Sequence, residues 1–273
     1  MSITLLEDRK LVRMTGADTE ALLQRLITTN LDKITAGEAG YGALLTPQGK
    51  ILFDFLVTRL PDGFLFDLDG RVVEDFIKKM TLYRLRSAIA IDLLEDRVGY
   101  SFEPQPDGIR DPRSEALGWR LYGPADGWQP DGGHEDLKAR FVAEAIPQAG
   151  VDFEFGDAFP HDVNLDCLGG LDFAKGCYVG QEVVSRMQHR GTARKRLLHV
   201  EGAEALPAAA SPAEVSITAG GKTVGTLGQV SGNKGLALVR LDRIADALEE
   251  GQVIEVMGIG LKFSVPSYAN FSI

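Results

Sequence analysis

The sequence predicts an α+β fold that ends in a small antiparallel β-barrel. Two observations support this prediction. Helical and strand-like hydrophobic patterns both occur in the first part of the chain, and many short segments of β-branched and small residues, separated by glycine turns, fill the last part. At 273 residues, of which 44% are hydrophobic, the chain is long enough to bury a core in two or three domains.

The clearest elements lie in the first 70 residues. Residues 11–34 predict a strand, a turn and a helix, with Asp18 as the helix cap. Residues 40–68 predict a β-meander, because apolar runs alternate with the turn sequences Pro47-Gln48-Gly49 and Pro61-Asp62-Gly63.

The middle of the chain is less regular. Apolar residues at helical spacing predict a helix over 71–87, and the apolar residues after it predict a buried strand over 88–96. Residues 101–133 are rich in Pro, Gly and Asp and predict short strands and loops. A helix is expected over 134–146, and a shorter one over about 179–189.

The C-terminal part has a different composition. Residues 201–214 contain few large apolar side chains and predict a loop. Residues 215–241 and 251–266 predict short strands joined by tight glycine turns, which is typical of a small barrel. We place a domain boundary near Arg196.

The composition argues against several classes of function. A net charge of −10 disfavours a general nucleic-acid-binding protein, because phosphate contacts need a basic face. Cys167 and Cys177 are the only cysteines and predict free thiols, and the four histidines show no zinc-binding spacing, so we expect no built-in metal site. With charged residues near its start and no long apolar run, we expect a cytoplasmic protein without a membrane span.

The densest chemistry lies between Phe173 and Gly191, in the sequence FAKGCYVGQEVVSRMQHRG. Cys177 follows Lys175 and precedes the expected helix. Because a helix N-terminus and a nearby ammonium both favour thiolate, the sequence predicts a reactive thiol if the side chain is exposed. The alternative is a buried and inert cysteine.

Gln181 and Glu182 follow in the same motif. Glu182 suits the first turn of a helix, where an acid interacts well with the helix dipole. The alternative is a functional one, in which the carboxylate accepts hydrogen bonds from the amino group and ring N–H of a pterin or guanine edge. Gly180 would then let the ring come close to the backbone.

Two further features carry charge. Six basic residues form either a solvated face or a groove for an anionic ligand tail or a partner's acidic surface: Arg186, His189, Arg190, Arg194, Lys195 and Arg196. Asp54 lies in an apolar strand, where alternation places it on one face with Leu52 and Leu56. It is either an edge residue that faces outward or a pocket acid that points at a ligand.

The string Lys175-Gly176-Cys177-Tyr178, followed by Gly180-Gln181-Glu182, resembles the signature of the YgfZ-type folate-binding proteins. The resemblance covers the whole chain, including the family's opening helix (14–31), its strand-turn-strand (41–57) and its central motif (165–197). The wider superfamily contains the aminomethyltransferase of the glycine cleavage system, whose comparable stretch has the Tyr-Gly-Gln-Glu end of the motif but lacks the Lys-Gly-Cys start.

This resemblance implies a GcvT-like folate-binding fold. Mixed and antiparallel sheets with helices would form two intertwined N-terminal lobes, and the barrel would complete a cloverleaf-like arrangement. The lobes would comprise residues 1–40 with 98–195, and residues 41–97. The folate-binding region would then cover 1–195 and the barrel domain 196–273.

The resemblance also implies a site. The cofactor would be tetrahydrofolate or a derivative, with Glu182 holding the pterin and Asp54 corresponding to a strand carboxylate of the folate pocket. The aminomethyltransferase typically has an acidic pair where this chain has Phe53-Asp54. Cys177 and Asp54 are the candidate catalytic residues, and the other candidate cofactor-binding residues are Gln181, Gly180, Tyr178, Lys175 and Arg186.

Besides a folate carrier in which the thiol has no role, two functions follow from the resemblance. The first is a tetrahydrofolate-binding accessory protein that supports assembly or repair of iron–sulfur proteins, including iron–sulfur tRNA-modifying enzymes, with Cys177 as a transient or shared ligand, since a cluster needs about four ligands. The second is a folate-dependent aminomethyl transferase. The expected partners are folate and iron–sulfur client or assembly proteins, and we expect a monomer with no direct contact to nucleic acid.

Overall fold

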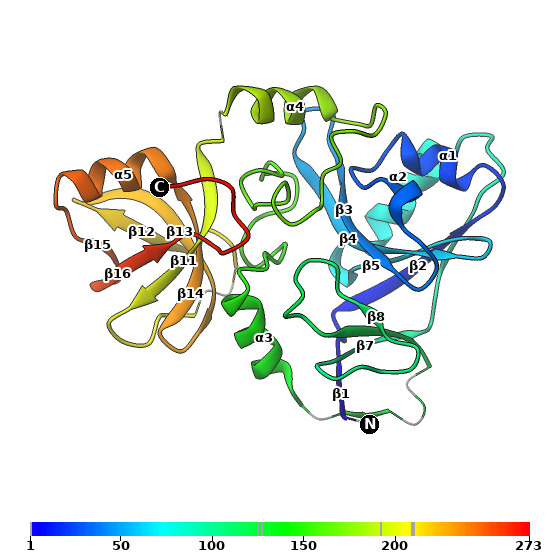
Figure 1. Ribbon diagram of the computed structural model, residues 1–273, viewed down its shortest axis with the longest axis horizontal. Helices are drawn as coiled ribbons and strands as arrows, with labels where there is room; N and C mark the ends of the chain where they lie inside the picture. Colours follow the sequence, from blue (N-terminus) through cyan, green and yellow to red (C-terminus); the bar gives the residue numbers. More distant parts are fainter. Residues whose placement is uncertain (1, 125, 127, 131, 192, 209–210) are drawn as a thin grey trace. The chain divides into compact units, whose positions relative to one another are not determined.

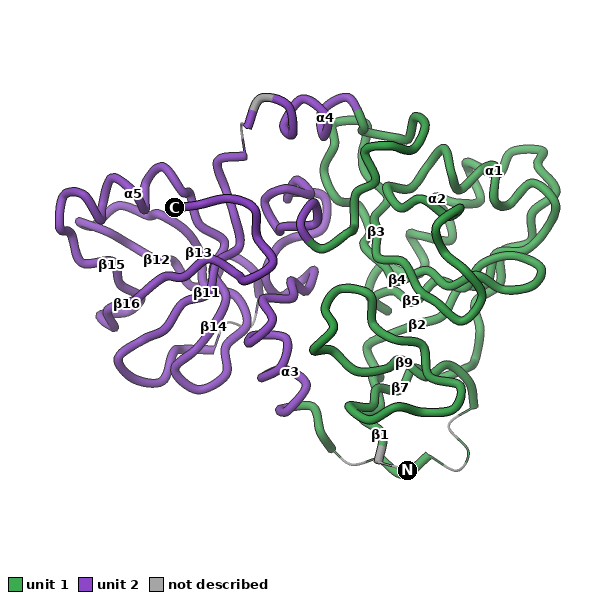
Figure 2. The backbone as a smooth tube through the Cα atoms, viewed as in Figure 1, with its two compact units in different colours: residues 1–134, 168–181 green, residues 135–167, 182–273 purple. Residues whose placement is uncertain are grey.

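The computed structural model describes residues 2–124, 126, 128–130, 132–191, 193–208 and 211–273. The chain forms two compact units, and neither unit is one continuous segment (Figure 2). Unit 1 contains residues 1–134 and 168–181, and unit 2 contains residues 135–167 and 182–273. The domain boundaries expected from the resemblance stay a prediction.

One sheet of unit 1 is antiparallel and has the strand order β3-β4-β5-β2-β6. Figure 1 labels β3, β4, β5 and β2 among these strands. Its strands are β2 (Arg9–Thr15), β3 (Ala39–Leu45), β4 (Ile51–Leu60), β5 (Gly63–Asp69) and β6 (Ala90–Leu93). The expected β-meander is confirmed, because tight turns join β3 to β4 and β4 to β5.

Strand β6 corrects one prediction from the sequence. It was expected to be buried, but it pairs with β2 alone and forms an edge of the sheet. Three of its four residues are exposed. An apolar run does not distinguish a central strand from an edge strand, because that depends on which strands pair with it.

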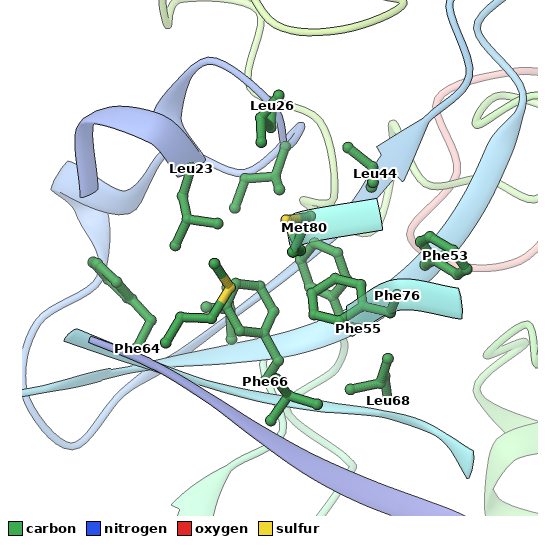
Figure 3. Packing of buried hydrophobic residues seen from close by; sticks show 14 of the residues in the cluster. Leu23, Leu26, Leu44, Phe53, Phe55, Phe64, Phe66, Leu68, Phe76 and Met80 are labelled. Carbon is green, nitrogen blue, oxygen red and sulfur yellow. The ribbon is translucent and has the colours of Figure 1, made fainter. Parts of the chain in front are cut away.

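Two helices contribute to the apolar core on one face of this sheet (Figure 3). They are α1 (Thr19–Gln24) and α2 (Val73–Arg84), each accompanied by a short 3-10 turn, η1 (Leu31–Lys33) and η2 (Gly70–Val72). In the core the Phe53 and Phe76 ring centroids lie 5.7 Å apart and those of Phe55 and Phe66 5.0 Å apart, both edge to face. Such pairs add about 0.5–1.5 kcal/mol beyond their area burial.

Helix α1 is short, and its start differs from the prediction. Asp18 occupies the N-cap position, but its side chain makes no capping hydrogen bond. Asp18 Oδ2 instead accepts a hydrogen bond from the backbone N–H of Ala88 at 2.7 Å. The expected capping role is therefore wrong, because this carboxylate holds the loop between α2 and β6.

The second sheet of unit 1 is mixed, with the strand order β10-β1-β7-β9-β8. Strand β1 pairs parallel with β10 and antiparallel with β7. The strands are β1 (Ser2–Leu5), β7 (Arg97–Ser101), β8 (Ile109–Arg110), β9 (Trp119–Gly123) and β10 (Gln129–Pro130).

Unit 2 contains a closed barrel with the strand order β11-β14-β13-β12-β15-β16, and every pair in it is antiparallel. The predicted barrel is thus confirmed. Its strands are β11 (Lys195–Gly202), β12 (Val215–Ala219), β13 (Lys222–Ser231), β14 (Lys234–Arg240), β15 (Ile254–Val256) and β16 (Ile259–Ser264).

The helices assigned to unit 2 include one that was not predicted. This helix is α5 (Leu241–Glu249), labelled in Figure 1. Its residues Ile244 and Ala247 are buried in the barrel core. The other two are α3 (His134–Ala143) and α4 (Gln181–Arg190), both close to their expected ranges. Among the helices that the structure describes, none has the length and apolar character needed to span a membrane.

Candidate functional site

The motif that contains Cys177 forms a loop of unit 1 that leads into α4. Lys175 holds this loop from inside. Its Nζ donates hydrogen bonds to the carbonyl oxygens of Ile27, at 2.8 Å, and Thr29, at 2.6 Å. Asp172 supports the same turn, because its Oδ1 accepts hydrogen bonds from the backbone N–H groups of Ala174 and Lys175. The ammonium of Lys175 therefore positions the loop.

Burial changes the protonation of Lys175. The side chain is only 9% exposed. Desolvation lowers the pKa of its ammonium to about 8, although the negative charges of Asp172 and Asp32 partly oppose this shift. A group with this pKa is still mostly protonated at neutral pH and loses its charge in mildly alkaline solution.

Gly180 holds the other end of the loop. Its backbone has φ = +80°, and a Cβ built at this position would lie 2.6 Å from the carbonyl oxygen of Thr46 and 3.1 Å from Cα of Gly49. The motif thus packs backbone against backbone on the turn between β3 and β4. The sequence suggested that Gly180 leaves room for a ligand ring, but in this structure the β3–β4 turn fills that space.

Tyr178 and Gln181 also make contacts within the motif. The Gln181 side chain accepts a hydrogen bond from the Tyr178 backbone N–H at 3.4 Å. The Tyr178 ring is buried, and its centroid lies 5.7 Å from Lys175 Nζ. Desolvation raises the pKa of the Tyr178 hydroxyl to about 12, so it stays protonated.

Cys177 is exposed, whereas Lys175 and Tyr178 in the same motif are buried. Helix α4 begins at Gln181, four residues after Cys177. The helix dipole acts mainly within the first turn, so Cys177 lies outside the region where the dipole is strongest. The other cysteine, Cys167, belongs to unit 2 and is half-buried, with its Sγ 3.3 Å from Oδ1 of Asn270. Burial raises the pKa of the Cys167 thiol. Of the two thiols, Cys177 is the accessible one.

Glu182 and Arg186 form an exposed pair on α4. Arg186 donates a hydrogen bond to Glu182 Oε1 at 2.7 Å, and the Glu182 side chain is 85% exposed. Such i,i+4 pairs in solvent contribute only about 0.3–0.5 kcal/mol. A ligand could therefore replace this contact at little cost to the fold.

The six basic residues between Arg186 and Arg196 do not share one environment. The guanidinium of Arg196 is buried and binds the carboxylate of Asp166 at 2.7 and 3.0 Å. Arg194 and Lys195 are exposed. The side chain of Arg190 lies outside the described residues.

Asp54 and Leu56 lie on the face of β4 opposite the aromatic core, as alternation predicted. Leu52 was expected on the same face but packs against that core, beside a register shift between β3 and β4. It is only 7% exposed. The Tyr41 hydroxyl donates a hydrogen bond to Asp54 Oδ2 at 3.3 Å. Desolvation raises the pKa of the Asp54 carboxyl, while the positive charges of Arg9 and Arg113 partly oppose this shift.

Asp54 belongs to a buried charge cluster within unit 1. The cluster joins three carboxylates to three guanidinium groups: Asp54, Asp67, Asp111, Arg9, Arg113 and Arg120. Asp67 accepts from Arg9 at 2.6 Å and lies 3.3 Å from Arg120. Asp111 and Arg113 lie 2.7 Å apart. Equal numbers of opposite charges reduce the cost of burying them.

The two most strongly coupled members behave differently from Asp54. Burial raises the pKa of Asp111, but the charge of Arg113 and its hydrogen bonds outweigh burial and hold this pKa at about 2. The guanidinium carbon of Arg113 also lies 5.5 Å from the ring centroid of Tyr41. Arg113 thus connects the Asp111 pair to the Tyr41–Asp54 pair.

Sequence reasoning found Asp54 but missed the rest of this cluster. A detectable signal existed, because Asp67 and Asp69 alternate with large apolar residues in β5 as Asp54 does in β4. The partners Arg113 and Arg120 come from a segment expected to contain only short strands and loops. Arg113 pairs locally with Asp111, two residues before it, but the contact of Arg120 with Asp67 depends on the tertiary fold.

Comparison with known proteins gives matches along nearly the whole chain. Residues 194–271 match the family model of the CAF17 C-terminal β-barrel domain. The human mitochondrial iron–sulfur cluster assembly factor IBA57 is 32% identical, over 96% of this chain and 84% of that protein. The mouse protein of the same name is also 32% identical, over 93% and 83%, and a homolog from Pyricularia oryzae is 30% identical, over 91% and 74%.

A solved structure shows the same fold. The glycine cleavage system aminomethyltransferase T from Bartonella henselae superposes with a TM-score of 0.69, over 98% of this chain and 86% of that one. Its sequence identity of 14% shows similarity of fold alone. The expected GcvT-like α+β fold is confirmed.

The expected compartment is not confirmed. We expected a cytoplasmic protein from the absence of targeting and membrane features in the sequence. The human, mouse and Pyricularia relatives are all named as mitochondrial proteins, which contradicts that expectation. Charged residues near the start of the chain and the lack of a long apolar run do not identify the compartment.

Proposed function

Because this chain belongs to the family of the IBA57 iron–sulfur cluster assembly factors, we propose that it is an accessory factor in the assembly or repair of iron–sulfur proteins. The observation that carries the proposal is the placement of Cys177. Its thiol is exposed on a loop that Lys175 and Gly180 fasten to the body of unit 1 on either side.

This placement suits a shared ligand. Thiolates are the usual protein ligands of iron–sulfur clusters, and a cluster needs about four of them. Cys177 supplies one, so a partner protein must supply the others while the cluster is transferred or repaired. A fixed loop favours such a contact, because little conformational freedom is lost when the partner binds. The cluster is then cargo, held for a short time between two proteins.

We further propose that the chain binds tetrahydrofolate through Glu182 and Arg186. A carboxylate matches the donor edge of a pterin, and a guanidinium matches the carboxylates of a folate tail. These two side chains fit such a ligand because they are exposed and, among the residues that the structure describes, pair with each other alone at little energetic cost. Lys175 and Gly180 fit it less well, since protein backbone already occupies them.

The alternative function, aminomethyl transfer, is not favoured. Its acidic pair would require a second carboxylate at position 53, next to Asp54. Phe53 instead packs against Phe76, because neighbouring residues of a strand point to opposite faces. The iron–sulfur tRNA-modifying enzymes remain our proposed clients, alongside other iron–sulfur enzymes.

Complementation tests the main proposal. Cells that lack this protein would receive the wild-type chain, Cys177→Ser or Cys167→Ser, and the activities of an iron–sulfur dehydratase and an enzyme without a cluster would be measured. We expect wild type and Cys167→Ser to restore the dehydratase and Cys177→Ser to fail at equal protein level. If the dehydratase activity does not fall in the deleted strain, the proposal is wrong.

Folate binding is tested separately by titration calorimetry with tetrahydrofolate under anaerobic conditions. We expect Glu182→Gln to weaken binding by about tenfold or more, because a hydrogen bond to a charged group is worth about 1.5–3 kcal/mol. Lys222→Gln, at an exposed position of the barrel, serves as the control. If wild type and Glu182→Gln bind tetrahydrofolate with equal affinity, Glu182 does not belong to the folate site. The proposed role of Cys177 would be unaffected by that result.

A further inference from the structure

The end of helix α2 carries an exposed patch that the proposed function does not use. We define the α2 patch as Lys78, Leu82, Leu85 and Arg86. Leu82 and Leu85 are 64% and 85% exposed, and the two basic residues beside them are exposed as well. Leu82 lies in the last turn of α2 and Leu85 directly follows the last residue of the helix, so both exposed leucines belong to the same helix end.

The backbone at Leu85 is unusual. This residue follows the last residue of α2 and has φ = 47° and ψ = −107°. A positive φ is a genuine outlier for a bulky side chain, whereas glycine, which has no Cβ, adopts such conformations readily. Strained positions of this kind occur most often at functional sites.

The surrounding loop is held firmly in this conformation. The Ser87 backbone N–H donates to the Arg84 carbonyl oxygen at 2.8 Å, and the Arg84 side chain donates to the Ile89 carbonyl oxygen at 3.1 Å. Asp18 accepts from the Ala88 N–H, as described above. These contacts fix the backbone on both sides of Leu85, whose side chain is exposed to solvent.

Stability of the folded chain does not account for a leucine here. The core face of α2 consists of Val73, Phe76 and Met80, and the patch residues lie outside the core cluster. Cations suit the C-terminal end of a helix dipole, which explains the basic residues. The helix dipole does not explain the two exposed leucines. Leu85 in particular has a backbone conformation that glycine would adopt without strain.

We propose that the α2 patch docks a partner protein through apolar side chains bordered by carboxylates. Charge supports this choice of partner, because the patch is locally basic in a chain with a net charge of −10. An anionic membrane is a poorer match, since it repels the chain as a whole and needs a longer apolar helix face than two leucines provide. The proposal does not depend on the role of Cys177.

Photo-crosslinking followed by binding measurements tests the proposal. A benzophenone amino acid would replace Leu85 in living cells, and Leu248, an exposed leucine near the end of α5, in a control. Any protein captured only from position 85 would be purified. Its affinity for the chain would then be measured by calorimetry with wild type, Leu85→Ser, Arg86→Glu, Leu248→Ser and Lys222→Glu.

We expect Leu85→Ser and Arg86→Glu each to weaken binding about tenfold, as a contact in the centre of an interface does, and added salt to weaken it further. The two control variants should stay within about twofold. Equal capture at positions 85 and 248, or equal affinity of all variants for the purified protein, overturns the proposal.

Two further measurements test whether Leu85 serves the fold or a membrane instead of a partner protein. Leu85→Gly should raise the thermal midpoint of unfolding, and a lower midpoint would show that the leucine serves the fold, which overturns the proposal. Flotation with phosphatidylglycerol vesicles should leave the chain unbound. Binding to vesicles that Leu85→Ser abolishes would assign the patch to a membrane and overturn the protein partner.

Discussion

The ammonium group of Lys175 lies 2.6 Å from the carbonyl oxygen of Thr29, a residue 146 positions earlier in the chain. This hydrogen bond and its neighbour to Ile27 anchor the Cys177 loop in unit 1. The first lysine of the motif therefore acts on the thiol indirectly, by fixing the backbone that carries it.

Replacing Lys175 by methionine should destabilise the protein by about 1.5–3 kcal/mol, the usual worth of hydrogen bonds to a charged group. Urea denaturation measures this. Lys33→Met is the matched control, because Lys33 is 68% exposed in its ion pair with Asp172 and should cost less than about 1 kcal/mol. Equal losses for the two variants would contradict the anchoring role.

Lys175 also predicts a pH dependence. Its pKa is lowered to about 8 in the folded protein from the usual 10.5, so between these values the unfolded chain binds more protons and the free energy of unfolding rises with pH. Below pH 8 the lysine is charged in both states and contributes no slope. Compared with wild type, Lys175→Met should lack this rise between pH 8 and 10, and identical slopes would disprove it.

Asp54 and Asp111 should respond to amide substitution with opposite signs. The folded-state pKa of Asp54 is raised, so its contribution to stability falls as pH rises above 3.8, and Asp54→Asn should remove this fall. The pKa of Asp111 is held at about 2, so its contribution is lost as pH falls from about 4 to 2. Asp111→Asn should remove that loss.

The two variants should also differ in size of effect. At pH 7, Asp111→Asn leaves Arg113 buried without its ion pair and should cost about 3–5 kcal/mol. Asp54→Asn should stay within about 1 kcal/mol of wild type, since an amide oxygen can still accept from Tyr41. Denaturation curves between pH 3 and 7 test both, and a larger loss for Asp54→Asn would refute the assignment of the paired carboxylate.

Two glycines of the motif give a matched test of loop geometry. Gly180→Ala should cost about 1–3 kcal/mol or more, because its φ of +80° is strained for alanine and the new Cβ would meet the Thr46 carbonyl. Gly176→Ala should stay within about 0.5 kcal/mol, as nothing lies within 4 Å of the added Cβ. Similar costs would mean that the loop does not pack on the β3–β4 turn as described.

The two cysteines should differ in reactivity. Cys177 is exposed, whereas Cys167 is half-buried and its pKa is raised first by burial and then by Asp166. We expect the Cys177 thiol to react with a disulfide reagent about tenfold faster than the Cys167 thiol at pH 8. Thiolate is the reactive form, and the raised pKa and partial burial of Cys167 make its thiolate scarce and less accessible. The fast phase should vanish in Cys177→Ser and remain in Cys167→Ser.

Local patterns predicted much of the fold. Alternation in β4 correctly placed Asp54 on one face with Leu56, although Leu52 packs against the core instead, and the spacing of glycine turns correctly indicated the barrel. Strand β6 was wrongly predicted to be buried. It lies at the edge of the sheet because it pairs with β2, and the residues of β6 themselves do not indicate this position.

The site was harder to predict for the same reason. The residues of the motif are contiguous, so the sequence showed them together. Their roles depend on distant partners, such as Thr29 for Lys175 and Thr46 for Gly180, which only the tertiary structure brings near. A lysine and a glycine that looked like ligand-binding residues therefore prove to contact protein backbone.

The division of unit 1 into two segments has a consequence for biosynthesis. Its two sheets are complete once residue 134 has left the ribosome, but residues 168–181 are added only after another 33 residues of unit 2 have been translated. Nascent chains fold from the N-terminus as they emerge. The Ile27 and Thr29 carbonyls therefore emerge long before their partner Lys175. A chain terminated between residues 134 and 168 contains every strand of both sheets but lacks the loop that carries Cys177.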